Sequence, residues 1–156
     1  MKKLLILLLA PFFGFAQLNL IDLKNMANQK ADFSIDYIKQ KGYSYRQERD
    51  IPDGTKQLYY EKGKLSRTLV VLKVGPNSNN LISYVPETAT NYNEILNSVK
   101  KDNFQLINTT SGEMDNCSEY QSKEYFTKLC EIQFPNQSEK SYNITYYLFL
   151  IYLRYI

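Results

Sequence analysis

The chain has 156 residues, with 19 basic and 16 acidic side chains and a formal net charge of +3. It contains no His, which excludes Ser-His-Asp and Cys-His catalysis and any imidazole metal site. The near balance of charges argues against nucleic-acid binding, which needs a basic face that contacts many phosphates.

The first 16 residues are typical of a signal peptide. Two lysines open the segment, an apolar run follows, and Gly14-Phe15-Ala16 offers a small-x-small cleavage site before Gln17. A transmembrane anchor is the alternative, but the apolar run is broken by Pro11 and is shorter than the roughly 20 residues that span a bilayer. We therefore expect a periplasmic or secreted protein without a stable membrane span, whose single domain is residues 17–156.

The first half of this domain predicts two helices and then four strands. Apolar residues recur at helical spacing in 19–28 and again from Ala31 to Ile38, and Gly42 ends the second helix. Turns are expected at Pro52-Asp53-Gly54 and Lys62-Gly63. The strands are predicted at 43–49, 57–61, 64–74 and 81–85.

The second half repeats this pattern at an offset of 61 residues, with one helix in place of two. Ile38 falls on Val99, and Gly42 falls on Asn103, which is another residue that tolerates the left-handed conformation at a helix end. Strands are predicted at 104–109, 118–121 and 125–134, with a last one from Tyr142 to about Leu150. We interpret the pattern as a duplication, with repeat one at about 19–85 and repeat two at about 88–150.

Cys117 and Cys130 are the only cysteines. A two-residue turn at Lys62-Gly63 places Lys56 opposite Leu69, and the offset of 61 then places Cys117 opposite Cys130. Non-hydrogen-bonded antiparallel pairs have Cα atoms about 4.5 Å apart, which a disulfide can bridge. We expect a structural disulfide in an exported protein. Two buried free thiols are the alternative.

Strand alternation predicts which side chains are buried and which face outward. The side of the sheet that faces away from the core is expected to carry three tyrosines. We predict them as candidate protein-binding residues, because Tyr is enriched at interfaces. Scattered surface aromatics are the alternative. The expected outward tyrosines are Tyr59, Tyr120 and Tyr125. The expected buried residues are Leu58, Tyr60, Leu65, Leu69 and Val71 in the first half, and Phe126, Cys130, Ile132 and Phe134 in the second.

No catalytic residue, metal ligand or cofactor site is predicted. Asp50 and Asp53 lie near a glycine but lack the ligand ladder of a calcium loop. Glu113 and Asp115 form a close carboxylate pair, which we interpret as part of a solvated loop.

These elements predict one α+β domain, in which two tandem helix-plus-four-strand repeats form one antiparallel sheet with helices on one face. This order of elements resembles the β-lactamase inhibitor protein group and the PepSY-like exported proteins. The resemblance implies a binder or inhibitor that presents a sheet face. We expect an exported, non-catalytic protein that engages another protein in an inhibitor-like or immunity-like role. The alternative is a small-molecule or lipid carrier in the cell envelope.

Overall fold

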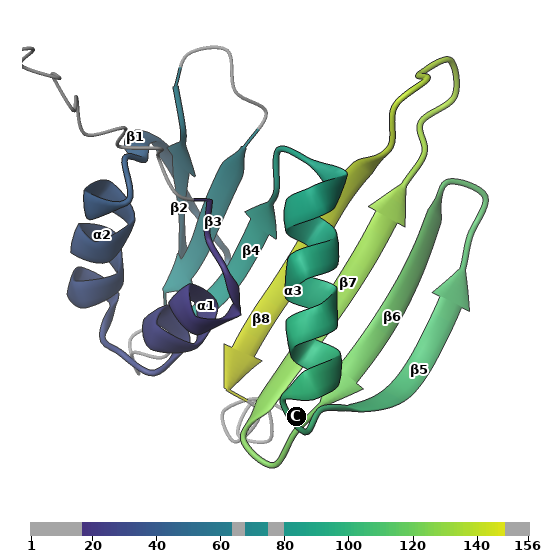
Figure 1. Cartoon of the computed structure of the whole chain (residues 1–156). Helices are drawn as coiled ribbons and strands as arrows, with labels where there is room; N and C mark the ends of the chain where they lie inside the picture. The colour runs from purple at the N-terminus through teal and green to yellow at the C-terminus, as the bar shows by residue number, and fades with distance from the viewer. Residues whose placement is uncertain (1–16, 64–67, 75–79, 149–156) are drawn as a thin grey trace, which may run out of the picture.

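The computed structural model describes residues 17–63, 68–74 and 80–148 (Figure 1). The predicted signal peptide, Leu65 and the chain beyond Leu148 lie outside the described residues. The helices are α1 (Leu20–Ala27), α2 (Ala31–Gln40) and α3 (Ala89–Lys101). The strands are β1 (Ser44–Asp50), β2 (Lys56–Glu61), β3 (Leu69–Val74), β4 (Leu81–Val85), β5 (Gln105–Ser111), β6 (Asp115–Gln121), β7 (Tyr125–Ile132) and β8 (Ser141–Leu148).

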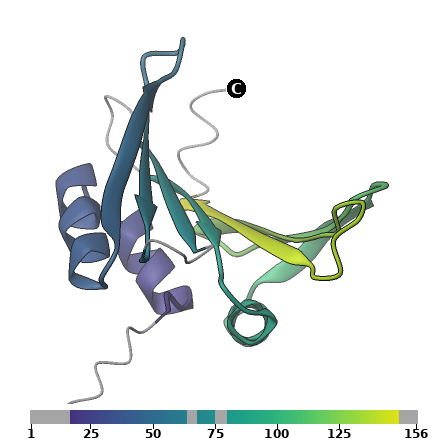
Figure 2. The ribbon, with the colours of Figure 1, turned by 90° about the horizontal axis from the view of Figure 1, so that it is seen from above.

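The eight strands form one antiparallel sheet in the order β1-β2-β3-β4-β8-β7-β6-β5. Strands β4 and β8 meet at its centre, so the last strand of each half joins the two halves. The three helices lie on one face of the sheet (Figure 1). This arrangement confirms the predicted α+β class. The sheet twists and bends between its halves, with the helices outside the bend and the helix-free face inside it (Figure 2).

Local signals position the helices. The Asn19 side chain accepts a hydrogen bond from the Asp22 N–H, and the Asp22 carboxylate accepts one from the Asn19 N–H, so α1 begins with a capping box. The Thr88 hydroxyl caps α3 by accepting from the Asn91 N–H. After α2 and α3 the chain turns at Gly42 (φ 85°) and Asn103 (φ 57°), as predicted.

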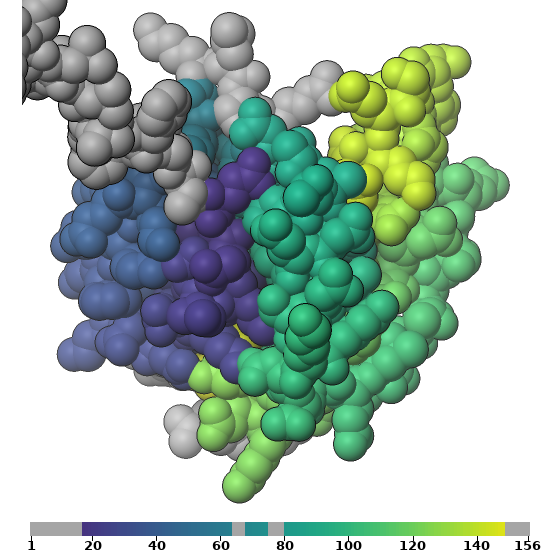
Figure 3. Space-filling view, in the orientation of Figure 1, coloured from purple at the N-terminus to yellow at the C-terminus, as the bar shows by residue number. Residues whose placement is uncertain are grey.

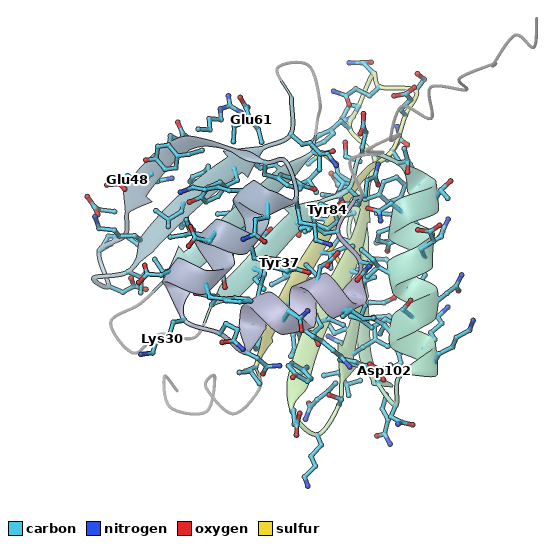
Figure 4. The ribbon with its side chains drawn as sticks, turned by 60° about the vertical axis from the view of Figure 1, so that its left-hand side comes forward. Lys30, Tyr37, Glu48, Glu61, Tyr84 and Asp102 are labelled. Atoms are coloured by element: carbon cyan, nitrogen blue, oxygen red, sulfur yellow. A yellow bond between two sulfur atoms is a disulfide. The ribbon has the colours of Figure 1, made fainter. Side chains whose placement is uncertain are left out.

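The core lies between the helices and one face of the sheet. It is filled by side chains that are almost completely shielded from solvent, and each contributes roughly 1.5–3 kcal/mol by burial. In Figure 4, Tyr37 and Tyr84 lie in this interior, whereas Glu48 and Glu61 lie toward the outer edge. The largest fully buried side chains are Tyr84, Tyr146, Leu18, Leu23, Met26, Ile38, Leu72, Ile82, Ile95, Leu129, Ile144 and Val70.

The hairpin between β2 and β3 differs from the prediction. Lys56 pairs with Val74, not with Leu69, because the connection after Glu61 is longer than a two-residue turn. This register places Val70 and Leu72 against the helices at 0% exposure. The predicted burial of Leu69 and Val71 is therefore wrong, since both are only half-buried and lie on the helix-free face.

The second half departs from the constant offset at its first hairpin. In the first half, the Ile51 N–H donates to the Thr55 carbonyl across three intervening residues. In the second half, the Gly112 N–H donates to the Asp115 carbonyl across two. One residue fewer inverts every side chain of β6 relative to the predicted register. The duplication itself stays a prediction, although β1 and β5 each carry a bulge at matching positions, Tyr45/Gln47 and Leu106/Asn108.

Candidate functional site

The helix-free face of the sheet is the candidate binding surface, and we call it the open face. Its side chains alternate with the buried core residues along each strand. One row of cross-strand partners crosses nearly the whole sheet from β2 to β6, and every side chain in it is partly exposed. The row consists of Tyr59, Val71, Ser83, Thr145, Lys128 and Glu119.

Aromatic side chains lie in both halves of the open face. Tyr59, on β2, is half-buried as predicted for an outward residue, and its hydroxyl donates to the Gln57 Oε1 at 2.8 Å. Phe126 and Tyr147 are cross-strand partners on β7 and β8, and their rings stack with centroids 4.9 Å apart. Aromatic rings held in fixed positions are the side chains that most often anchor protein interfaces.

The centre of the open face is polar but uncharged. The Asn143 amide on β8 donates to the Ser83 hydroxyl on β4 at 3.1 Å, which ties the two halves together. Next to it, Lys128 forms an ion pair with Glu119 at 3.1 Å. Hydrogen bonds from Lys128 and Asn108 hold the pKa of Glu119 below its usual value. The open face therefore combines apolar contact area with hydrogen-bonding groups, as the core of a protein interface does.

Tyr120 and Tyr125 do not belong to this surface, and their predicted outward position is wrong. They are only 6% and 8% exposed and face the helices. The Tyr125 hydroxyl accepts a hydrogen bond from the Asn28 amide, and its ring lies 5.4 Å from that of Tyr146. The shorter β5–β6 hairpin causes the error for Tyr120, because it places this residue where Tyr60 lies in the first half.

The sulfur atoms of Cys117 and Cys130 lie 2.08 Å apart, at disulfide-bonding distance. The two residues are cross-strand partners with Cα atoms 4.1 Å apart, as the sequence predicted. The pairing follows from a true two-residue turn at Lys123-Glu124, where the Ser122 N–H donates to the Tyr125 carbonyl at 2.8 Å. The bridge lies on the open face and joins β6 to β7. The same register places Phe126, Ile132 and Phe134 away from the core, so their expected burial is wrong. Phe134 is 41% exposed, and Phe126 and Ile132 are half-buried.

A groove of about 330 Å³ lies on the other face, between α3 and the strands β5 and β6. Leu96 and Tyr92 form one wall, and most of the remaining lining is polar. The groove exists because α3 leaves this edge of the sheet uncovered (Figure 3). Its polar lining, which includes Lys100, Ser118 and Glu131, does not suit a lipid chain.

Comparison with protein-family models, curated proteins and solved structures gives no match. Within residues 17–63, 68–74 and 80–148, no helix is long and apolar enough to cross a bilayer. In the same residues, no three carboxylate or thiol groups gather in a way that could hold a metal ion.

Proposed function

We propose that the protein is an exported, non-catalytic binding protein that engages another protein through the open face, in an inhibitor-like or immunity-like role. The observation that carries the proposal is the open face, an eight-stranded surface free of helices in the described residues. Its aromatic and aliphatic side chains are only partly shielded. Export rests on the predicted signal peptide, and a cross-strand disulfide suits an oxidising compartment.

The composition of the open face favours a folded protein partner over a polyanion or a charged small molecule. Lys128 is neutralised by Glu119, and Lys73 is paired with Asp53 at 2.9 Å. Paired charges leave no field of one sign to attract a polyanion. Tyr59 lies on β2 in one half of the sheet and Phe126 lies on β7 in the other. The sheet bends between the halves with the open face on the inside, so a convex partner can contact both residues (Figure 2).

The test is capture of a partner from envelope extract by the wild type and by two matched variants. The first variant carries Tyr59→Ser and Phe126→Ser on the open face. The control carries Phe33→Ser on α2, an aromatic that is 45% exposed on the helix side. Truncation of an interface anchor costs about 2 kcal/mol or more, which weakens binding about thirtyfold, so the double variant should bind roughly a thousandfold more weakly when the two costs add.

The control variant should retain the wild-type affinity. Circular dichroism and thermal melting of all three proteins establish that each one is folded. Equal affinities for the double variant and the wild type would remove the open face as the binding surface. A loss confined to Phe33→Ser would move the site to the helices.

A further inference from the structure

The two edge strands of the sheet differ in charge. All seven residues of β5 (Gln105–Ser111) are exposed, and none carries a charge. Its Leu106 and Ile107 are 55% and 50% exposed. All seven residues of β1 (Ser44–Asp50) are exposed as well, but four of them are charged, and three of these form ion pairs with Lys56 or Glu61 of β2. Charged side chains on an edge strand discourage pairing with another chain, so β5 lacks this protection and β1 has it.

The backbone of β5 is available for a further strand. The Gly112 N–H donates to the Asp115 carbonyl at 2.7 Å, which makes this a hydrogen-bonded pair of the antiparallel ladder. Alternation along the ladder then directs the N–H and C=O groups of Thr109 and Ser111 away from β6. The helices leave this edge uncovered, so among the described residues no element on the helix side blocks an approaching strand (Figure 3).

Charges at the two ends of β5 indicate which strand fits. Lys100 and Lys101 precede it, and Glu113 follows it; all three are exposed. Among the described residues, no ion pair involves any of them. If two copies of β5 pair in antiparallel fashion, the basic start of each strand lies beside the acidic end of the other. The two copies are then related by a two-fold axis, so this contact between basic and acidic ends occurs twice in the dimer.

We propose that the chain forms a symmetric dimer by antiparallel pairing of β5 with β5 of a second copy, which extends the sheet across the two subunits. This interface lies at the sheet edge, apart from the open face, and it goes beyond the proposed function. The two-fold axis is perpendicular to the sheet, so the helices of both copies lie on the same side. The open faces of the two copies then form one continuous surface.

The backbone part of the proposal is tested with a proline on each edge. The Thr109 N–H points away from β6, so Thr109→Pro leaves the hydrogen bonds within the chain intact but blocks pairing with a second copy. Glu48→Pro is the matched control on β1. The Ile51 N–H donates to the Thr55 carbonyl at 2.9 Å, and the same alternation directs the Glu48 N–H outward. Sedimentation equilibrium of the purified protein, over about 1–500 μM, measures the dimer dissociation constant.

The charged ends are tested by exchange. Lys101→Glu and Glu113→Lys should each weaken the dimer about three- to tenfold, because each places like charges together twice. The double variant should return to within about twofold of the wild type. This series does not depend on whether Thr109→Pro folds.

The expected results are a wild-type dimer, a dissociation constant at least about tenfold higher for Thr109→Pro, and no change for Glu48→Pro. A wild type that stays monomeric over the whole concentration range would overturn the proposal. An equal effect of the two prolines, or a double charge variant no better than the single ones, would also overturn it.

Discussion

Removal of the Cys117–Cys130 bridge is predicted to lower the free energy of unfolding by about 3 kcal/mol. The two residues are separated by 13 positions, and a loop of this length loses that much entropy in the unfolded chain when it is closed. For a domain of this size the loss corresponds to a melting temperature lower by roughly 10 °C. The folded state should change little, because the strands β6 and β7 are paired along seven registered residue pairs without the bridge.

The variant to measure is Cys117→Ala with Cys130→Ala, by urea unfolding followed with circular dichroism. Wild type treated with a reductant should unfold at the same urea concentration as the variant, and the reductant should not change the variant. Intact mass after alkylation of the unfolded, unreduced wild type should show no free thiol. Two alkylated thiols, or a difference in unfolding free energy below about 0.5 kcal/mol, would refute the reasoning.

Three further predictions concern the interior. Asp22, at 3% exposure, accepts from Tyr37 and pairs with Lys41 at 2.8 Å, so Asp22→Asn should lower the unfolding free energy by about 2–3 kcal/mol in urea, whereas Asp32→Asn on the exposed side of α2 should not. The nitrogen of the buried Asn80 amide lies within hydrogen-bonding distance of the Met26 carbonyl in α1, the Gln29 carbonyl after it and the Ser34 hydroxyl on α2, and Asn80→Ala should cost about 2 kcal/mol in the same assay. Burial raises the pKa of Tyr84 to about 12, above the value of about 10 in the unfolded chain. The stability that this shift contributes is present below pH 10 and is lost as the pH rises toward 12, so the part of the tyrosinate absorbance that comes from Tyr84 and the other buried tyrosines should appear in step with loss of the circular dichroism signal. Gradual ionisation of all tyrosines while the fold persists would contradict this.

The order of helices and strands could be predicted because short-range signals determine it. The helix ends at Gly42 and Asn103 and the β-rich runs between turns each depend on a few neighbouring residues. The structure places these features where the sequence indicated them. The cysteine pairing was predicted correctly although the first-half hairpin from which it was transferred has another register, because the second half does have a two-residue turn, at Lys123-Glu124.

The faces of the strands in the second half could not be predicted from a constant offset. The β5–β6 hairpin is one residue shorter than its counterpart in the first half, and the β2–β3 connection is longer than the expected turn. Each change shifts the register, and a shift of one residue exchanges the two faces. Residues 59 and 60 are both Tyr, so either offset matches Tyr120 with a tyrosine, and residue identity could not reveal the slip.

The candidate site was found only in part for the same reason. Tyr59 was placed on the correct face, but Phe126 was expected to be buried, and Tyr147 was not considered. Alignment of the two halves by hairpin closure instead of by a fixed offset would have found Phe126. The contrast between Pro52-Asp53-Gly54 and the shorter second turn was the available signal.

The most direct test of the proposed function is site-specific photo-crosslinking in intact cells. A photoreactive phenylalanine analogue is introduced at Tyr59 on the open face and, as a matched control, at the exposed aromatic Phe33 on the helix side. Binding through the open face predicts a discrete crosslinked protein adduct from position 59 and none from position 33. An adduct of the same size from position 33, or none from position 59 at equal protein levels, would contradict binding through the open face.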